Sequence, residues 1–370
     1  MQDPFKEYIT QSEPSKRDKG YAWHTAIGLQ AVDGLKPSTY LIHIAIKNIE
    51  GDITLDEVQT LLNTYYEESP KTDTNDRTEE ADKVSLRIAR ILLENAFSFT
   101  PNEYISIHRK LFYGIYSHAG KIRDYNITKK EWILNGNTVL YGSATELKAT
   151  LEYDFSLERQ FSYKGLSIGE IITHLAHFIS NLWQIHVFGE GNTRTTAVFF
   201  IKYLRTLGFH ATNDIFAKNS WYFRNALVRA NYTDLKNGIH ETTEYLELFL
   251  RNLLLDENNI LSNREMHISE AFNKFQKLDI QTEELDIQNK KLDIEKKLNE
   301  FDHNLSAKAI LNAIILFTRL KDSIFGRSMV ENVTGLKSSQ ASNLIKLLLN
   351  SNVIEPVKGH GKGRYRFIQN

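Results

Sequence analysis

The chain of 370 residues contains no cysteine, only six prolines and a net charge of −1. The absence of cysteine excludes disulfide bonds and thiol chemistry. The near balance of charge excludes a field that would draw nucleic acid to the whole protein, so any such contact has to come from a local patch. Scarce proline beside plentiful Leu, Ile, Lys and Glu favours a mainly α protein.

Long apolar runs are also missing. The longest lies at 309–317, is interrupted by Asn312, and is too short to span a bilayer. No basic and apolar leader opens the chain. We therefore expect a cytoplasmic protein with no membrane partner.

The most informative stretch present is His-Val-Phe-Gly-Glu-Gly-Asn-Thr-Arg at residues 186–194, called here the signature stretch. Apolar residues at helical spacing precede it at 171–185 and follow it at 197–204, which predicts a tight loop between two buried helices. The loop would end at the N-terminus of the second helix, where free N–H groups bind anions and glycine allows close approach. A base, a carboxylate and an anion cradle together indicate chemistry on a nucleotide phosphate.

The signature stretch resembles the motif of the Fic family, HxFx(D/E)GNGRxxR, whose members mostly transfer AMP from ATP to a protein hydroxyl. Six positions match, namely His186, Phe188, Glu190, Gly191, Asn192 and Arg194. Two positions depart, because Thr193 replaces a glycine and Ala197 replaces the final arginine. The resemblance implies a Fic-type helical core, ATP as substrate, Mg²⁺, and a protein target that offers a hydroxyl side chain.

Physical roles can be assigned to these residues. His186 is the expected general base, since an imidazole titrates near neutral pH. Glu190 is the expected Mg²⁺ ligand, and Phe188 is expected to anchor the loop in the core. The predicted phosphate-binding group is Gly189, Glu190, Gly191, Asn192, Thr193 and Arg194. Taken singly, His186 would be read as a helix-capping histidine and Glu190 as a solvated acid; the set together favours a phosphate site.

Ala197 is the more consequential departure, because the family's arginine there contacts the terminal phosphate of ATP. Lys202 or Arg205 could supply the missing cation, or the nucleotide could bind in another orientation. Thr193 adds a Cβ that could change the local dihedral angles of the loop. Two alternatives stay open: transfer of another nucleotide or phosphate ester, and a DNA-binding regulator that senses a nucleotide without catalysis.

A second element is predicted at residues 131–141. Trp132, Ile133 and Leu134 precede the turn signal Asn135-Gly136, which indicates a β-hairpin. Fic proteins carry such a hairpin, the flap, which pairs with a target segment by strand addition. The alternative is that this segment only covers an edge of the core.

The N-terminal third resembles the region that precedes many Fic cores, on Ile49-Glu50-Gly51 and Thr54-Leu-x-Glu57-Val. In the family this glutamate pairs with the second arginine of the motif and blocks ATP, so Glu50 is a candidate inhibitory residue, with Arg194 as its nearest plausible partner. The alternative is a helix that ends at Gly51 and leaves Glu50 exposed. Thr54 and Glu57 fit a capping box in either case.

The predicted organisation has four parts: a helical regulatory region at 1–68, the Fic core at 81–255, a connecting helix at 256–303 and a terminal domain at 304–370. Leu-Asp-Ile recurs at 278, 285 and 292 in the connecting part. Leu and Ile two residues apart fall on nearly opposite faces of a helix, which makes a poor coiled coil. We expect a long helix over 262–302, with homodimerisation through it as an alternative.

Residues 304–370 resemble a winged helix-turn-helix, with helices at 307–320, at 328–333 and from a capping Ser338, then a basic hairpin. Such folds place the third helix in the major groove and the wing on phosphate. The residues expected at base edges are Ser338, Ser339, Gln340, Ser342 and Asn343, and those expected at phosphates are Lys358, Lys362, Arg364 and Arg366. DNA is the predicted partner, and protein docking is the alternative.

Overall fold

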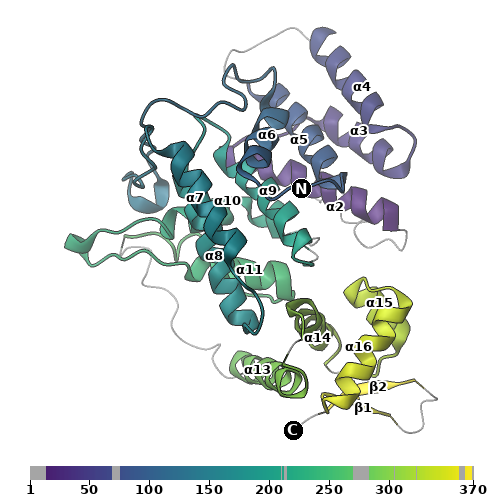
Figure 1. Ribbon diagram of the computed structural model, residues 1–370. Helices are drawn as coiled ribbons and strands as arrows, with labels where there is room; N and C mark the ends of the chain where they lie inside the picture. Colours follow the sequence, from purple (N-terminus) through teal and green to yellow (C-terminus); the bar gives the residue numbers. More distant parts are fainter. Residues whose placement is uncertain are drawn as a thin grey trace. The chain divides into compact units, whose positions relative to one another are not determined.

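The computed structural model describes residues 14–68, 76–209, 211, 215–269, 283–303, 305–321, 323–357 and 363–368. Over these ranges the protein is predominantly helical, as the composition predicts, and regular strand is confined to β1 (Ile354–Pro356) and β2 (Tyr365–Phe367) (Figure 1). None of the helices within these ranges combines the length and the apolar character needed to cross a membrane.

The chain divides into two compact units, one drawn from residues 1–160, 176–249 and 260–273, the other from 161–175, 250–259 and 274–370. Helices α8 (Ile168–Ile185) and α11 (Glu244–Leu255) contribute residues to both. The other elements of the first unit are α2 (Pro14–Gly28), η1 (Leu29–Asp33), α3 (Thr39–Glu50), α4 (Leu55–Glu68), α5 (Thr78–Leu93), α6 (Pro101–Phe112), η2 (Trp132–Leu134), α7 (Leu147–Gln160), α9 (Asn192–Thr206), α10 (Ile215–Arg229) and η3 (Leu235–Asn237).

Helix α9 runs through the core of the first unit, since every residue from Asn192 to Leu204 is buried. It packs against α6 and α5, and α2 packs against α5 and α10. An α-helix that is covered on all sides is typical of the centre of a large helical domain. The start of α9 is consequently held in a buried setting, which places the signature stretch at the centre of the unit.

The ends of α3 and α4 follow the sequence closely. Gly51 ends α3 in the left-handed region at φ 91°, and Glu50 is exposed, as the second interpretation of this segment predicts. The capping box is confirmed: the Thr54 N–H donates to Glu57 Oε2 at 2.6 Å, and the Glu57 N–H donates to Thr54 Oγ1 at 3.2 Å.

The predicted β-hairpin at 131–141 is wrong. Trp132–Leu134 form the 3₁₀ turn η2, closed by a bond from the Glu131 N–H to the Asn137 carbonyl at 2.9 Å. Ile133 and Leu134 are both fully buried, whereas successive residues of a strand point to opposite faces. The turn lets both neighbours enter the core and leaves Trp132 half exposed, and pairing of this segment with a target strand stays a prediction.

The predicted extent of the long connecting helix, residues 262–302, is also wrong. Residues 256–269 form turns, bends and irregular chain, with the Ile268 N–H donating to the Ile133 carbonyl at 2.9 Å. Helix α13 (Glu283–Phe301) occupies only the later part, and residues 270–282 lie outside the described ranges. Within α13, Leu292 is exposed and Ile294 is buried, as expected for residues on nearly opposite faces.

In the second unit, α14 (Ala307–Leu320), α15 (Arg327–Thr334) and α16 (Ser338–Asn350) precede the antiparallel pair of β1 and β2. Ile354 pairs with Phe367, and a further bridge joins Phe325 to Tyr365. The apolar residues shared by helices and strands make one core, which includes Leu316, Phe325, Val330, Leu348 and Phe367.

One helix start in the second unit differs from the prediction, and two predicted DNA-binding residues lie outside the described ranges. The N-cap of α16 is Lys337, whereas the sequence predicted Ser338. Gln340 occupies the third helical position, and its side chain reaches back to accept from the Lys337 N–H at 3.1 Å. Lys358 and Lys362 fall outside the described residues.

Candidate active site

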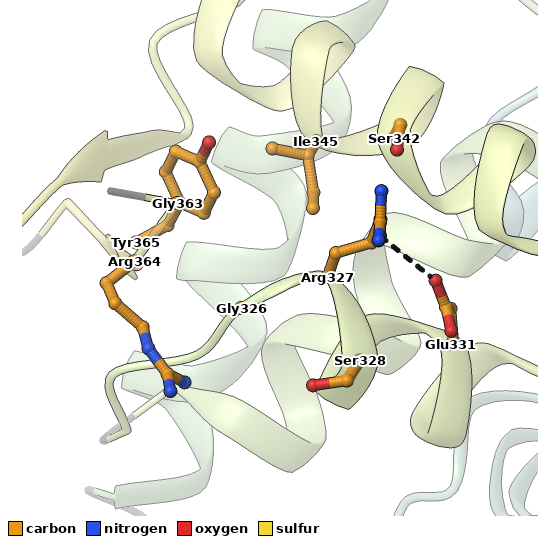
Figure 2. A pocket seen from close by; sticks show the side chains of 9 residues that line it. All are labelled: Gly326, Arg327, Ser328, Glu331, Ser342, Ile345, Gly363, Arg364 and Tyr365. Atoms are coloured by element: carbon orange, nitrogen blue, oxygen red, sulfur yellow. Dashed lines mark ion pairs between the residues drawn. The ribbon is translucent and has the colours of Figure 1, made fainter. Parts of the chain in front are cut away.

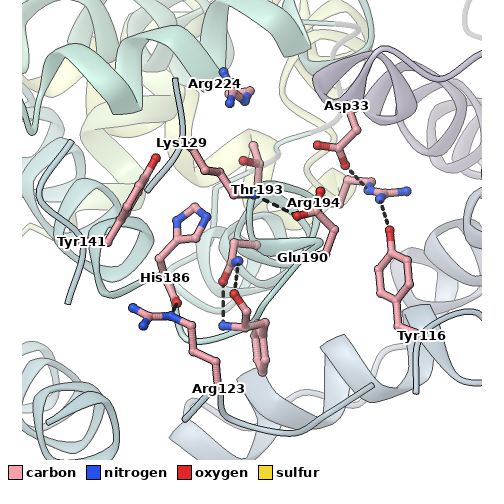
Figure 3. Close-up of polar contacts among 12 residues, drawn as sticks. Asp33, Tyr116, Arg123, Lys129, Tyr141, His186, Glu190, Thr193, Arg194 and Arg224 are labelled. Carbon is pink, nitrogen blue, oxygen red and sulfur yellow. Dashed lines mark hydrogen bonds and ion pairs between the residues drawn. The ribbon is translucent and has the colours of Figure 1, made fainter. Parts of the chain in front are cut away.

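The signature stretch is a tight loop between α8 and α9, as predicted. His186 follows α8 with φ 51°, an unusual angle for a residue with a side chain, and Gly191 leads into α9 with φ 76°. Arg123 fixes this exit from α8: its Nε donates to the His186 carbonyl at 2.7 Å and its Nη2 to the Gly142 carbonyl at 2.6 Å. A buried guanidinium thus holds the backbone of the expected base in place (Figure 3).

Space restricts both loop glycines, and the backbone angle restricts Gly191 as well. A Cβ added at Gly191 would lie 2.4 Å from the Phe112 ring, and one added at Gly189 would lie 2.5 Å from the Tyr125 hydroxyl. There is therefore no room for a side chain at Gly191, whereas a side chain at Gly189 would require the exposed Tyr125 to move.

Phe188 anchors the loop, as the sequence predicts. Its buried ring stacks on His108 of α6 with 3.7 Å between ring centroids. The Asn192 amide spans the loop, accepting from the Phe188 N–H at 3.0 Å and donating to the Phe188 carbonyl at 2.7 Å. Asn192 was expected to grip phosphate, but its side chain is used to hold the loop closed.

The surroundings of the His186 ring favour a neutral imidazole, which can act as a base. Its ring is buried against Tyr141, 4.2 Å between centroids, and Nδ1 lies 3.3 Å from the Trp183 carbonyl. That contact favours the proton on Nδ1 and leaves Nε2, which has no hydrogen-bond partner among the described residues, as an acceptor. Burial, and then the charge of Lys129, lowers the pKa of His186 well below its ordinary value, so the imidazole is uncharged at neutral pH.

Glu190 pairs with Lys129, whose Nζ lies 2.9 Å from Oε2 (Figure 3). Both side chains line a cavity of about 620 Å³, within the range of small-molecule sites. The charged lining consists of the cations Arg77, Lys129, Lys130 and Arg224 and the acids Asp33, Glu131 and Glu190. We call this cavity the Lys129 pocket.

The fit of Mg²⁺ can be judged from this donor set. No cluster of three or more potential metal ligands occurs within the ranges that the structure describes. Mg²⁺ commonly binds through one or two carboxylates together with substrate phosphates. A half-exposed Glu190 fits a metal that arrives with a nucleotide, and it does not by itself form a resident metal site.

Arg194 is fully buried, and its guanidinium is paired with carboxylates of the protein. Its Nε lies 2.8 Å from Asp33 Oδ2, and its Nη2 lies 2.7 Å from Glu80 Oε1. Nη1 donates to Gln30 Oε1 at 3.0 Å, and the guanidinium covers the Phe112 ring at 4.8 Å. The expected grip of Arg194 on phosphate is therefore replaced by contacts within the protein in this conformation.

The predicted pairing of Glu50 with Arg194 is wrong. Glu50 Oε2 lies 2.8 Å from Lys16 Nζ at the end of α3, and the carboxylates at Arg194 are those of Asp33 and Glu80. The left-handed turn at Gly51 ends α3 and leaves the Glu50 side chain on the surface. An inhibitory role for Glu50 stays a prediction. Such a role would have to operate without an ion pair between Glu50 and Arg194.

The two departures from the motif are accommodated differently from expectation. Thr193 takes a helical position in α9 and accepts from Trp183 Nε1 at 3.0 Å, so its hydroxyl joins the two helices. Ala197 is fully buried. Lys202 and Arg205 do not take the place of the arginine, since they donate to the main-chain carbonyls of Glu94 and Leu92 at the other end of α9.

The start of α9 keeps anion-binding capacity. The Thr195 N–H makes the first helical bond, to the Gly191 carbonyl at 3.1 Å, so the N–H groups of Asn192, Thr193 and Arg194 precede the helical ladder. These donors and the helix dipole favour negative charge beside Glu190 and Lys129.

Sequence reasoning missed the residues that surround the signature stretch. Lys129, Arg123 and Tyr141 come from the segment after α6, and Asp33 and Glu80 come from η1 and α5. Lys129 and Lys130 form a short basic pair directly before the turn, which was the one local signal available. Asp33 and Glu80 lie far from Arg194 along the chain, and nothing local marks them as its partners.

The chain is similar to a known protein family, to a protein adenylyltransferase and to a solved structure. Residues 98–204 match the model of the Fic/DOC family, so the class of this region is a Fic/DOC domain. The chain is 28% identical over 155 residues to the protein adenylyltransferase VbhT of Bartonella schoenbuchensis, covering 36% of this chain and 31% of that protein. It thus spans about a third of that relative's length. A Fic family protein from Desulfovibrio desulfuricans G20 gives a TM-score of 0.43 at 11% identity, over 99% of this chain and 94% of the other.

Proposed function

We propose that the first unit transfers AMP from ATP to a Ser, Thr or Tyr hydroxyl of a protein. The observation that carries this proposal is the buried His186, with its unpaired Nε2, in the loop that also bears Glu190 and leads into the start of α9. The Fic/DOC match and the similarity to a protein adenylyltransferase support nucleotide transfer as the reaction class.

In this mechanism, His186 Nε2 takes the proton of the target hydroxyl as that oxygen attacks the α-phosphorus of ATP. The new P–O bond forms while the bond from the α-phosphorus to the bridging oxygen breaks, and pyrophosphate leaves. The N–H groups at the start of α9 stabilise the charge on the phosphoryl oxygens. Lys129 supplies the positive charge that an arginine at the position of Ala197 would otherwise provide.

Mg²⁺ would be held by Glu190 and by phosphate oxygens, after Lys129 releases the carboxylate. Bound there, it would neutralise the charge of the nucleotide's phosphates. Every other contribution in this proposal comes from the chain itself.

A second candidate is a nucleotide-sensing regulator without transfer activity. The specific observation in its favour is Arg194, whose guanidinium is occupied by Asp33 and Glu80 and whose neighbour along α9 is Ala197. Transfer of a different nucleotide or phosphate ester fits the same geometry. We also infer that α14, α15, α16 and the β1–β2 pair form a winged helix-turn-helix, because three helices followed by a hairpin, with Phe325 bridging Tyr365, is its order of elements.

The test is incubation of the full chain with labelled ATP, GTP, CTP and UTP, followed by mass spectrometry of self-modification. Labelled AMP transfer is expected, and His186→Ala should lower its rate by about a hundred-fold or more. His177→Ala is the matched control, because His177 is an exposed histidine on α8. Transfer at an unchanged rate in His186→Ala would contradict the mechanism, and no transfer with any nucleotide would favour the regulator.

A further inference from the structure

The second unit holds a polar cavity of about 500 Å³ between the start of α15, α16 and the start of β2 (Figure 2). We call it the α15 pocket. Two guanidinium groups belong to it, those of Arg327 and Arg364, and hydroxyl groups come from Ser328, Ser342 and Tyr365. Donors of this kind recognise an oxyanion, and arginine suits phosphate because its planar fork bonds two oxygens at once.

The backbone sets Arg364 at this place. Phe325 and Tyr365 exchange two backbone bonds of 2.9 Å, which puts Gly326 opposite Arg364 in the same ladder. A Cβ added at Gly326 would lie 3.1 Å from the Gly363 carbonyl and 3.4 Å from Arg364 Nη1. The close approach brings the N-terminus of α15, with the N–H groups of Arg327 and Ser328, to the side of Arg364, and such a terminus adds to the attraction for phosphate.

The sequence of the terminal segment carries an excess of positive charge. Residues 323–370 contain seven Lys or Arg and two Glu, in a chain whose net charge is −1. Both acids are paired: Glu331 lies 3.3 Å from Arg327 Nε, and Glu355 lies 2.6 Å from Arg366. Within the described part of this unit Arg364 is exposed and has no acidic partner. A local excess of positive charge of this kind is the electrostatic mark of a polyanion site.

The face of α16 next to the pocket is polar and open. Ser339, Ser342 and Asn343 are exposed, while Ala341, Leu344 and Leu348 belong to the core of the unit. Ile345 is the one apolar side chain of α16 that lines the pocket, and it is buried. An apolar docking groove would expose the opposite kind of residue. Small donors and acceptors on an exposed helix, beside a pocket for one phosphate, match the groove and backbone of a nucleic-acid duplex.

We propose that the α15 pocket binds a backbone phosphate of duplex DNA, held by Arg364, Arg327 and Ser328, and so sets the position of α16 in the major groove. The inference rests on the winged helix-turn-helix proposed above. It is independent of the transferase site, because the pocket is lined entirely by the second unit.

The experiment measures binding of the full chain to a fluorescent mixed-sequence duplex by anisotropy, over a series of salt concentrations. Arg364→Ala should weaken binding about ten-fold and reduce the slope of log affinity against log salt by about one. Glu331→Gln should strengthen binding several-fold, because it removes the acid that competes with phosphate for Arg327. A gain of affinity cannot arise from misfolding.

Arg319→Ala is the matched control: this arginine pairs with Asp256 in the same unit but does not line the pocket, and its loss should leave DNA affinity unchanged. Circular dichroism checks that each variant folds. The proposal is overturned if the full chain binds no duplex at low salt, or if Arg364→Ala and Glu331→Gln both bind as the parent does. Binding of a phosphoserine peptide in preference to DNA would also overturn it.

Discussion

Two arginines of this chain, Arg194 and Arg364, each lie beside the start of a helix, yet they are used in opposite ways. Arg194 is fully buried, and two carboxylates, an amide and a tyrosine hydroxyl surround its guanidinium. Arg364 is exposed beside a polar cavity and has no acidic partner in the described part of its unit. The comparison separates a charge that holds helices together from one that is available to a ligand.

The largest expected difference is in stability. Arg194→Ala should lower the free energy of unfolding by about 3–5 kcal/mol, because Asp33 and Glu80 would lose the cation that compensates them. Arg364→Ala should change it by no more than about 0.5 kcal/mol, as usual for a surface residue. Urea unfolding of both variants measures the contrast.

A control for the buried cluster removes the charges together. Arg194→Met combined with Asp33→Asn and Glu80→Gln should recover much of the lost stability, because no uncompensated charge stays buried. Equal stabilities of Arg194→Ala and Arg364→Ala would show that the buried cluster contributes nothing to holding the unit.

An intermediate effect is expected on the pH dependence of transfer. Burial and Lys129 both lower the pKa of His186, so the neutral base persists as pH falls below about 6.5, the ordinary histidine value. Lys129→Met removes one of these causes, so the pKa of His186 rises and the acid limb of kcat/KM moves to higher pH.

Lys130→Met serves as the control for that shift, since Lys130 lines the same pocket but is not among the charges that lower the pKa of His186. An acid limb that moves equally in both variants would mean that general depletion of positive charge, and not Lys129 itself, sets the base.

The smallest effect is expected at Glu50. Its ion pair with Lys16 is partly exposed, and exposed pairs contribute about 0–1 kcal/mol. Glu50→Gly should therefore leave nucleotide affinity, measured by titration calorimetry, as it is. A clear rise in affinity would restore Glu50 as an inhibitory residue and would point to another conformation of the N-terminal region.

The sequence predicts a structural feature well when the residues that cause the feature are neighbours along the chain. The loop between two helices at 186–194 follows from helical periodicity and glycine, which are read from neighbouring residues. The Asn135-Gly136 turn signal is local too, but it cannot tell that Ile133 and Leu134 both become buried, and that burial excluded the hairpin. The partners of Arg194 depend on contacts such as that with Glu80, 114 residues away, which no pattern in the chain reveals.

The protonation state of His108 matters for any measurement of activity against pH at this site. Its Nδ1 accepts from the Gly120 N–H at 2.8 Å, so Nε2 carries the proton toward the Glu190 carbonyl at 3.0 Å. Burial lowers the pKa of His108 to about 3. This support of the loop therefore keeps one protonation state across the range in which most assays are done, so an acid limb observed in that range does not come from His108.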